Sequence, residues 1–215
     1  MANPRERHRI ICSGFCRQRF DTPGPPLFCK HMPHDPGQVY SPAEDTFLLA
    51  AAALDEVRPA DRVIEIGTGS GYVAAQVLPV AVSVVTTEIN PHAAAAAHAR
   101  GIDVVRTDLV RGICGKFDLV LFNPPYLPTH CDERIDDWLE YALDGGPTGR
   151  SVVARFAQEI RRILAPGGRI LLLISSLTGP EEVRMLFRER RMVVEVVRRE
   201  PLEGEELLVL RITEK

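Results

Sequence analysis

Strand-like and helix-like segments alternate along this chain from Val39 onward, and this alternation constrains the fold more than any other feature. The first unit is a short apolar strand at 62–66, a glycine-rich turn and an apolar helix that stops before Pro79. Because parallel strands need a crossover and helices supply it, repeated units of this kind predict a mostly parallel sheet. We expect seven strands, at 62–66, 82–87, 102–107, 117–122, 169–175, 192–198 and 205–212.

Capping and breaking residues set the expected helix boundaries. The Ser-Pro-Ala-Glu run at 41–44 supplies a capping hydroxyl, a proline for the first helical position and an acid three residues after the cap, so a helix should begin there and run to about Val57. The Asn-Pro pair at 90–91 should cap an Ala-rich helix that ends at Gly101. Further helices are expected at 152–164, with Pro-Gly-Gly at 166–168 ending the first of them, and at 181–190.

The last two strands are joined by a polar turn at 200–204, which predicts a C-terminal hairpin. The expected fold class is therefore α/β: a Rossmann-like, seven-stranded, mostly parallel sheet with an antiparallel C-terminal hairpin and helices on both faces. The strand at 102–107 should lie at an edge of this sheet. Its Val104 and Val105 lack the Lys or Pro that usually protects an exposed edge.

The composition narrows the class of protein. With 215 residues, 45% of them hydrophobic, the chain can bury one full core but leaves no room for a large second domain. It has no apolar run long enough for a membrane span and no signal peptide, which favours a cytoplasmic protein. The formal net charge of −3 provides no overall attraction to nucleic acid, so duplex DNA is a disfavoured substrate.

Residues 1–34 differ from the rest, because arginines stand among prolines there without an apolar period. We therefore expect a basic, Cys- and His-containing extension at 1–34 and one folded domain at 35–215. A disordered tail, a segment upstream of a functional start at Met32, a presequence and a zinc site all remain open, although the spacing fits no well-defined zinc finger. The zinc ligands would come from Cys12, Cys16, Cys29, His31 and His34.

The turn after the first strand is the first candidate for ligand binding, because ligands of open parallel sheets bind beyond the carboxyl ends of the strands. It contains three glycines, Gly67, Gly69 and Gly71, whose missing side chains would let a ligand reach backbone N–H groups. Taken alone, the glycines also fit a tight turn or a dinucleotide site. Glu65, directly before them, is unfavourable beside a pyrophosphate but well suited to an ammonium or sulfonium group.

Acidic residues also end the next two strands. Glu88 stands where a carboxylate can accept hydrogen bonds from both hydroxyls of a ribose. Asp108 could accept a bond from an adenine amino group, and Leu109 could offer an apolar face and a backbone N–H. Each acid alone could be a solvated loop charge, but acids at the ends of three successive strands indicate a site for a nucleoside that carries a sulfonium group.

The fourth strand ends in Asn123, Pro124, Pro125 and Tyr126. The prolines stiffen this turn and remove two N–H donors, so the Asn side-chain oxygen and the Pro124 carbonyl can both accept hydrogen bonds from one NH2 group. Tyr126 can stack on a planar substrate. The simpler alternative is a rigid proline turn, but its place after the fourth strand favours methylation of a planar NH2 nitrogen.

These motifs, in this order, resemble those of class I S-adenosylmethionine-dependent methyltransferases. The segment 39–46, together with Asp144, Gly145, Gly146 and Gly149, resembles the HemK-like protein glutamine N5-methyltransferases in their short archaeal and eukaryotic form. The resemblance implies S-adenosylmethionine as the cofactor and a contact between Thr46 and that cofactor. It implies that the cofactor site consists of Thr46, Glu65, Gly67, Gly69, Gly71, Glu88, Asp108, Leu109 and Asn123, and that Asn123, Pro124, Pro125 and Tyr126 are catalytic.

The resemblance also implies a protein substrate and a partner. The substrate would be the glutamine of the Gly-Gly-Gln motif in a class I translation termination factor, and the partner a small zinc-binding activator subunit that pairs with an exposed sheet edge. The segment 127–151, with Trp138 and Tyr141, should form a substrate channel wall, unless Trp138 only anchors a surface loop.

Two other functions stay open at this point. The Asn-Pro-Pro-Tyr turn also serves adenine-N6 nucleic-acid methyltransferases, because adenine likewise presents a planar NH2 group. The chain could also be a non-catalytic module that binds RNA or protein through a basic helix, although helical arginines are more often a solvated face. The arginines of that helix are Arg184, Arg188, Arg190 and Arg191.

Overall fold

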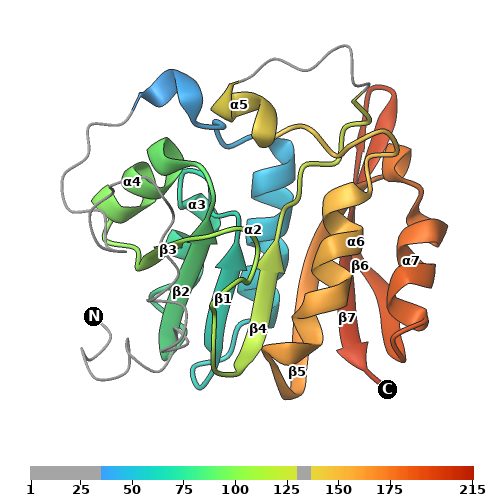
Figure 1. Cartoon of the computed structure of the whole chain (residues 1–215). Coiled ribbons are helices and arrows are strands. Elements are labelled where there is room, and N and C mark those ends of the chain that lie inside the picture. Colours follow the sequence, from blue (N-terminus) through green and yellow to red (C-terminus); the bar gives the residue numbers. More distant parts are fainter. Residues whose placement is uncertain (1–34, 130–136) are drawn as a thin grey trace.

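The computed structural model describes residues 35–129 and 137–215, and the extension 1–34 with its candidate zinc ligands lies outside the described residues. Strands and helices alternate as the sequence predicts (Figure 1). The elements are η2 (Pro36–Gln38), α2 (Glu44–Glu56), β1 (Arg62–Ile66), α3 (Tyr72–Val77), β2 (Ser83–Glu88), α4 (Pro91–Ala99), β3 (Val104–Arg106), β4 (Phe117–Phe122), α5 (Trp138–Tyr141), α6 (Ser151–Glu159), η4 (Ile160–Arg162), β5 (Leu164–Ser175), η5 (Ser176–Thr178), α7 (Pro180–Arg188), β6 (Met192–Leu202) and β7 (Glu205–Glu214).

The seven strands form one sheet in the order β3-β2-β1-β4-β5-β7-β6. Strands β1 to β5 run parallel, and β7 runs antiparallel to both β5 and β6. The expected Rossmann-like sheet with its antiparallel hairpin is therefore confirmed, and β3 lies at the expected edge. The order reverses between β1 and β4, and such a switch point is where open parallel sheets bind ligands.

Two apolar cores lie on opposite faces of the sheet, since successive side chains of a strand point to opposite sides. In β4, Leu119 and Leu121 face the core with α2, α3 and α4, whereas Val120 and Phe122 face the core with α6 and α7 (Figure 1). Both faces are thus covered, which is why the central strands are apolar throughout. No helix in the described ranges combines the length and apolar content that crossing a membrane requires.

The expected cap of the first long helix is wrong. We expected the Ser41 hydroxyl to begin the helix, but α2 begins at Glu44, its N-cap is Ala43, and Ala43 makes no side-chain capping bond. The carboxylate of Asp45 instead accepts a hydrogen bond from the backbone N–H of Thr46, at 2.6 Å. An acid inside the first turn therefore takes one of the free N–H groups that the cap would have taken.

The Pro-Gly-Gly run at 166–168 was expected to separate a helix from a strand. This expectation is wrong, because the run lies inside β5. Helix α6 and the short turn η4 end by Arg162, and the backbone N–H of Phe117 then donates to the carbonyl of Ile163 at 2.8 Å. Strand β4 therefore pairs with the segment before the glycines, and the register between β4 and β5 shifts between Phe117 and Leu119. The C-terminal strands are also longer than expected, so only residues 203–204 remain for the turn.

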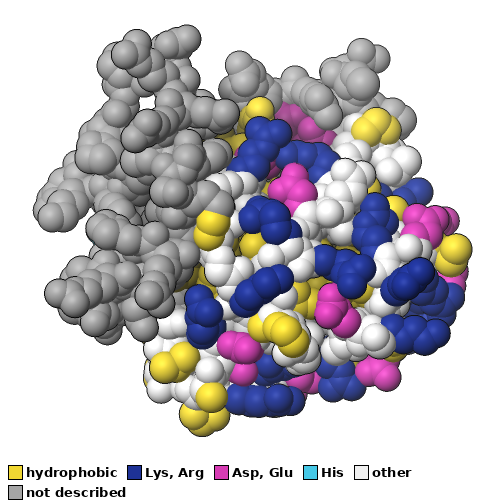
Figure 2. All heavy atoms as spheres, turned by 60° about the horizontal axis from the view of Figure 1, so that its bottom comes forward, with side chains coloured by type: hydrophobic (Ala, Val, Ile, Leu, Met, Phe, Trp, Pro, Cys, Tyr) yellow, Lys and Arg dark blue, Asp and Glu magenta, His cyan; other side chains and the backbone are white. Residues whose placement is uncertain are grey.

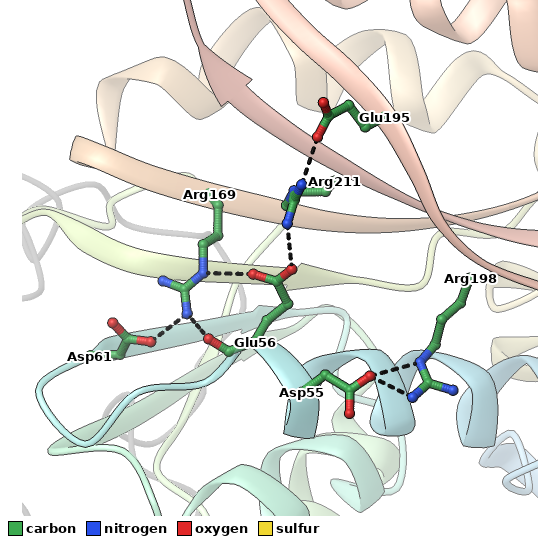
Figure 3. A network of polar contacts seen from close by, with 7 residues as sticks. All are labelled: Asp55, Glu56, Asp61, Arg169, Glu195, Arg198 and Arg211. Atoms are coloured by element: carbon green, nitrogen blue, oxygen red, sulfur yellow. Dashed lines mark hydrogen bonds and ion pairs between the residues drawn. The ribbon is translucent and has the colours of Figure 1, made fainter.

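A network of ion pairs joins α2 to the sheet, at the end opposite the carboxyl ends of the parallel strands (Figure 3). Arg169 of β5, whose side chain is 5% exposed, pairs with Asp61 at 2.7 Å and with Glu56 at 3.3 Å. The network is extended by Arg211, which pairs with Glu56 and Glu195, and an exposed Arg198–Asp55 pair lies beside it. Figure 2 shows the same lower side of the molecule, where basic and acidic side chains are intermingled.

The buried and exposed pairs of this network should differ in energy. Arg169→Met should lower the free energy of unfolding by about 3–5 kcal/mol, because it leaves buried Asp61 without its cation. Arg198→Met should lower it by less than about 1 kcal/mol, because solvent screens the exposed pair. Urea unfolding followed by circular dichroism measures both. Similar losses in the two variants would contradict this account.

Candidate active site

A cavity of about 780 Å³ lies at the carboxyl ends of β1 to β4, at the upper edge of the sheet in Figure 1. Parallel strands deliver their final residues to the same edge, so residues far apart in sequence meet there. Of the site residues expected from the sequence, only Gly71 does not line the cavity. The lining residues among them are Thr46, Glu65, Gly67, Gly69, Glu88, Asp108, Leu109, Asn123, Pro124, Pro125 and Tyr126.

Gly71 has a packing role in the turn after β1. It is the N-cap of α3 with φ +78°, a left-handed conformation that favours glycine. A Cβ at this position would lie 3.0 Å from the Cβ of Ala97 and 3.1 Å from its Cα, so glycine lets the turn approach α4 closely. Gly71 therefore contributes to the site by letting the turn pack against α4, and it does not contact the cavity itself.

Glu65 anchors the start of α3. Its Oε2 accepts hydrogen bonds from the Thr68 hydroxyl at 2.7 Å and from the backbone N–H of Ala74 at 2.9 Å. The bond from Ala74 satisfies an N–H in the first turn of α3, whose N-cap, Gly71, has no side chain. Burial raises the pKa of Glu65 to about 8, against the effect of the two donors. Both bonds use Oε2, so Oε1 is left for a ligand.

Glu88 connects two turns of the site. Its Oε1 accepts from the backbone N–H groups of Ile89 and Asn90, both at 2.8 Å, and its Oε2 accepts from Gly69 at 2.8 Å. Burial raises the pKa of this carboxyl, whereas the three N–H donors favour its charged form. The glycine-rich turn and the start of α4 are thereby held on one carboxylate at the sheet edge.

The turn after β3 carries Asp108 and Leu109. Asp108 forms an ion pair with Arg155 of α6, a partner that the sequence pattern did not reveal. Leu109 has φ +49°, which is uncommon for a residue with a side chain and marks local backbone strain. Strain of this kind often occurs where a backbone group is presented to a ligand.

The Asn-Pro-Pro-Tyr turn follows β4 and is supported by the glycines downstream. A Cβ on Gly149 would collide with the Tyr126 carbonyl, so only glycine permits this contact. The next residue, Leu127, donates its N–H to the Leu143 carbonyl at 3.3 Å and accepts from the Gly145 N–H at 2.9 Å. Burial raises the pKa of Tyr126 above its ordinary value, so its hydroxyl stays neutral near pH 7.

Asn123 has a partner that sequence reasoning missed. Its Nδ2 donates to Asp45 Oδ2 at 3.0 Å, and its Oδ1 is buried with no hydrogen-bond partner within the described residues. Thr46, expected at the cofactor, directs its hydroxyl to Asp45 at 3.1 Å. The only signal for Asp45 was its place in the segment 39–46, because the sequence separates it from Asn123 by 78 residues.

The described part of the segment 127–151, which was expected to form a wall, borders the cavity. Trp138 and Tyr141 of α5 line it, and their rings lie 5.4 Å apart. The backbone N–H of Trp138 donates to the side chain of Gln38 at 3.2 Å, which joins α5 to η2. Glu140 also lines the cavity, and both of its carboxylate oxygens are buried without a partner in the described parts of the chain.

The cavity is strongly acidic. Among its described lining residues, Arg155 is the one Lys or Arg side chain. A cavity of this kind attracts cationic ligands and repels phosphates. The carboxylates that line it belong to Asp45, Glu65, Glu88, Asp108, Glu140 and Asp144.

Several named proteins are similar to this chain in sequence or in fold. The profile of the family described as Methyltransferase small domain matches residues 44–137. A Methanocaldococcus jannaschii protein, provisionally named a protein N5-glutamine methyltransferase, is 40% identical over 180 residues, which cover 80% of this chain and 90% of the relative. Human methyltransferase HEMK2 is 36% identical over 169 residues, 71% of this chain and 78% of that protein.

A solved structure agrees with these relatives. A chain of the E. cuniculi Mtq2–Trm112 complex, which is responsible for methylation of the eRF1 translation termination factor, is 28% identical with a TM-score of 0.68. The match covers 83% of this chain and 99% of that one. The described strand order, the acidic strand ends and the 40% identical relative agree, and the chain belongs to the HEMK2-like protein N5-glutamine methyltransferases.

Proposed function

We propose that this methyltransferase transfers the methyl group of S-adenosylmethionine to the side-chain amide of the glutamine in a Gly-Gly-Gln motif of a class I translation termination factor. The observation that carries the proposal is the Oδ1 of Asn123, which is buried and has no hydrogen-bond partner among residues 35–129 and 137–215. An unpaired buried acceptor costs free energy unless a ligand supplies a donor, and an NH2 group is such a donor. The termination-factor substrate agrees with the stated activity of the similar Mtq2–Trm112 complex.

The acidic strand ends suit S-adenosylmethionine, which carries a ribose, an ammonium group and a sulfonium. We assign the ribose hydroxyls to Glu88 and the adenine to Asp108 and the strained Leu109. Glu65 and the glycine-rich turn, with Gly67 and Gly69, would hold the amino-acid part, and Thr46 would lie beside it. The bound cofactor supplies an electrophilic methyl group, and the surrounding carboxylates stabilise its positive charge.

The chain's own contribution to the reaction is alignment. The Oδ1 of Asn123 and the carbonyl of Pro124 would each accept one N–H of the substrate amide, which directs the nitrogen toward the methyl group. Pro125 keeps this turn rigid, and neutral Tyr126 offers a flat surface for the planar amide. The amide nitrogen would take the methyl group as the bond from that methyl to sulfur breaks, which leaves S-adenosylhomocysteine. One nitrogen proton would then pass to solvent, and it needs no strong base because it becomes acidic as the new bond forms.

The cavity also argues against the alternative functions. A nucleic-acid substrate would bring phosphates to a cavity lined by carboxylates, which disfavours an adenine-N6 methyltransferase. The helix proposed for RNA binding is largely neutralised, since Arg184 and Arg188 pair with Glu181 and Arg190 pairs with Glu189. The charged side chains of this helix therefore resemble those of an ordinary solvent-exposed helix face.

We also propose that a small zinc-binding activator subunit docks on the edge strand β3, in the cytoplasm. The similar Mtq2 is found in a complex with Trm112. Within the described part of this chain β3 pairs on one side only, with β2, and its Val104 and Val105 side chains are buried. The free backbone edge can accept a further strand.

Co-expression with such a subunit should raise the yield of monodisperse protein, because the partner would cover the exposed edge of β3. A fully active, monodisperse lone chain would contradict the proposal.

The role of Asn123 is open to a direct test. Asn123→Ala should lower turnover about 100-fold or more, the scale for loss of one preoriented polar contact, because the substrate amide loses an acceptor. S-adenosylhomocysteine should still bind, which calorimetry can measure. The assay compares a Gly-Gly-Gln peptide with its Gln→Ala version and with DNA, by mass spectrometry. Unchanged turnover in Asn123→Ala, or preferential methylation of DNA, would refute the proposal.

The raised pKa of Glu65 predicts a pH dependence of cofactor binding. Below its pKa of about 8 the carboxyl is mostly protonated, so the ammonium group that S-adenosylhomocysteine retains must displace a proton before it can pair with the carboxylate. The affinity for S-adenosylhomocysteine should therefore rise by up to about tenfold per pH unit between pH 6 and 8 and then level off. Glu65→Gln should bind more weakly at pH 8 and lose most of the slope. Calorimetric affinities that do not change from pH 6 to 8 in the wild type would contradict the assignment.

A further inference from the structure

Asp45 is a buried carboxylate that receives an unusual number of donors. It is 4% exposed and lies in the first turn of α2. Thr46 donates to its Oδ1 through the backbone N–H at 2.6 Å and through the hydroxyl at 3.1 Å, and the Tyr40 hydroxyl lies 3.2–3.3 Å from both oxygens. A carboxylate can only accept hydrogen bonds, so each group around Asp45 must present a donor to it.

The remaining donor to Asp45 is the amide of Asn123, through Nδ2 at 3.0 Å. An Asn amide can rotate by half a turn, which exchanges its donor and its acceptor at almost no cost in shape. The rotated amide would set Oδ1 against the Asp45 carboxylate, and two acceptors repel each other. The carboxylate therefore stabilises one orientation, in which Oδ1 is the buried acceptor that no described residue pairs with.

We propose that Asp45 is a positioning residue that holds the Asn123 amide in the orientation that accepts the substrate N–H. The inference rests on the proposed function, which gives Asn123 Oδ1 its ligand. In the rotated orientation Nδ2 would face the NH2 group of the substrate, and two donors cannot pair. The negative charge on Asp45 also polarises the amide and strengthens Oδ1 as an acceptor. Asp45 acts through Asn123 and touches no reacting atom.

The most informative substitution is Asp45→Asn, which keeps the size of the side chain and one acceptor oxygen. An Asn at this position can pair with Asn123 in either orientation, so the preference is lost while packing is kept. We expect kcat to fall about 10- to 100-fold, which is a smaller loss than the one expected for Asn123→Ala. KM and the affinity for S-adenosylhomocysteine should change less than about threefold. Retained S-adenosylhomocysteine binding shows that the variant is folded.

Glu44→Gln is the matched control. It removes an acidic charge from the neighbouring, exposed position of the same helix turn and has no contact with Asn123 among the described hydrogen bonds. Its kcat should equal that of the wild type. Equal losses in Glu44→Gln and Asp45→Asn would assign the effect to the charge at the start of the helix and overturn the proposal, as would unchanged kcat in Asp45→Asn.

A spectroscopic measurement separates this proposal from the proposed function. In 15N-labelled wild-type protein, with the Asn123 side-chain NH2 signal identified by its loss in Asn123→Ala, one of the two protons should exchange slowly and resonate downfield because it is bonded to a carboxylate. Asp45→Asn should remove this signature. If the peptide is not methylated but the signature is present, the function fails and the orientation stands; a wild-type signal typical of a solvent-exposed amide refutes the positioning role even if methylation occurs.

Discussion

The parallel pairing of β1 with β2 and β4 is the constraint on which the rest of the structure depends. Glu65 pairs with Thr86, and Ile66 pairs with both Thr87 and Phe122, so the three strands end at nearly the same height. Their next residues therefore meet at one sheet edge. The acidic residues and the Asn-Pro-Pro-Tyr turn form a single cavity for this reason, although they are scattered along the sequence.

Three of the acidic side chains at the site also accept backbone N–H groups at the starts of helices. Asp45 binds an N–H in the first turn of α2, Glu65 binds one in α3, and Glu88 binds the N–H of Asn90, the residue that caps α4. The N-caps of α2 and α3, Ala43 and Gly71, supply no side-chain bond of their own. The first N–H groups of a helix have no partner within the helix, so the fold can bury these acidic side chains with hydrogen-bond donors supplied. Under the proposed function, structural and ligand-binding roles are thus combined in the same side chains.

Burial of so many acids also shapes which ligand the cavity accepts. Glu65 and Glu88 have raised pKa values because burial removes them from water, and Arg155 is the one basic side chain among the described lining residues. A cationic methyl donor and a neutral amide fit such a cavity, whereas a polyanion does not.

The sequence by itself determined the seven strands, their alternation with helices, the acids at the strand ends and the Asn-Pro-Pro-Tyr turn, because apolar periodicity and turn residues are local signals. It did not reveal that Arg155 pairs with Asp108 or that the Pro-Gly-Gly run lies within β5. It also wrongly predicted that Ser41 caps the first long helix. Only the tertiary structure decided that Asp45 meets Asn123, since a hydrogen bond across 78 residues depends on how α2 packs against the sheet. No local pattern carries that information.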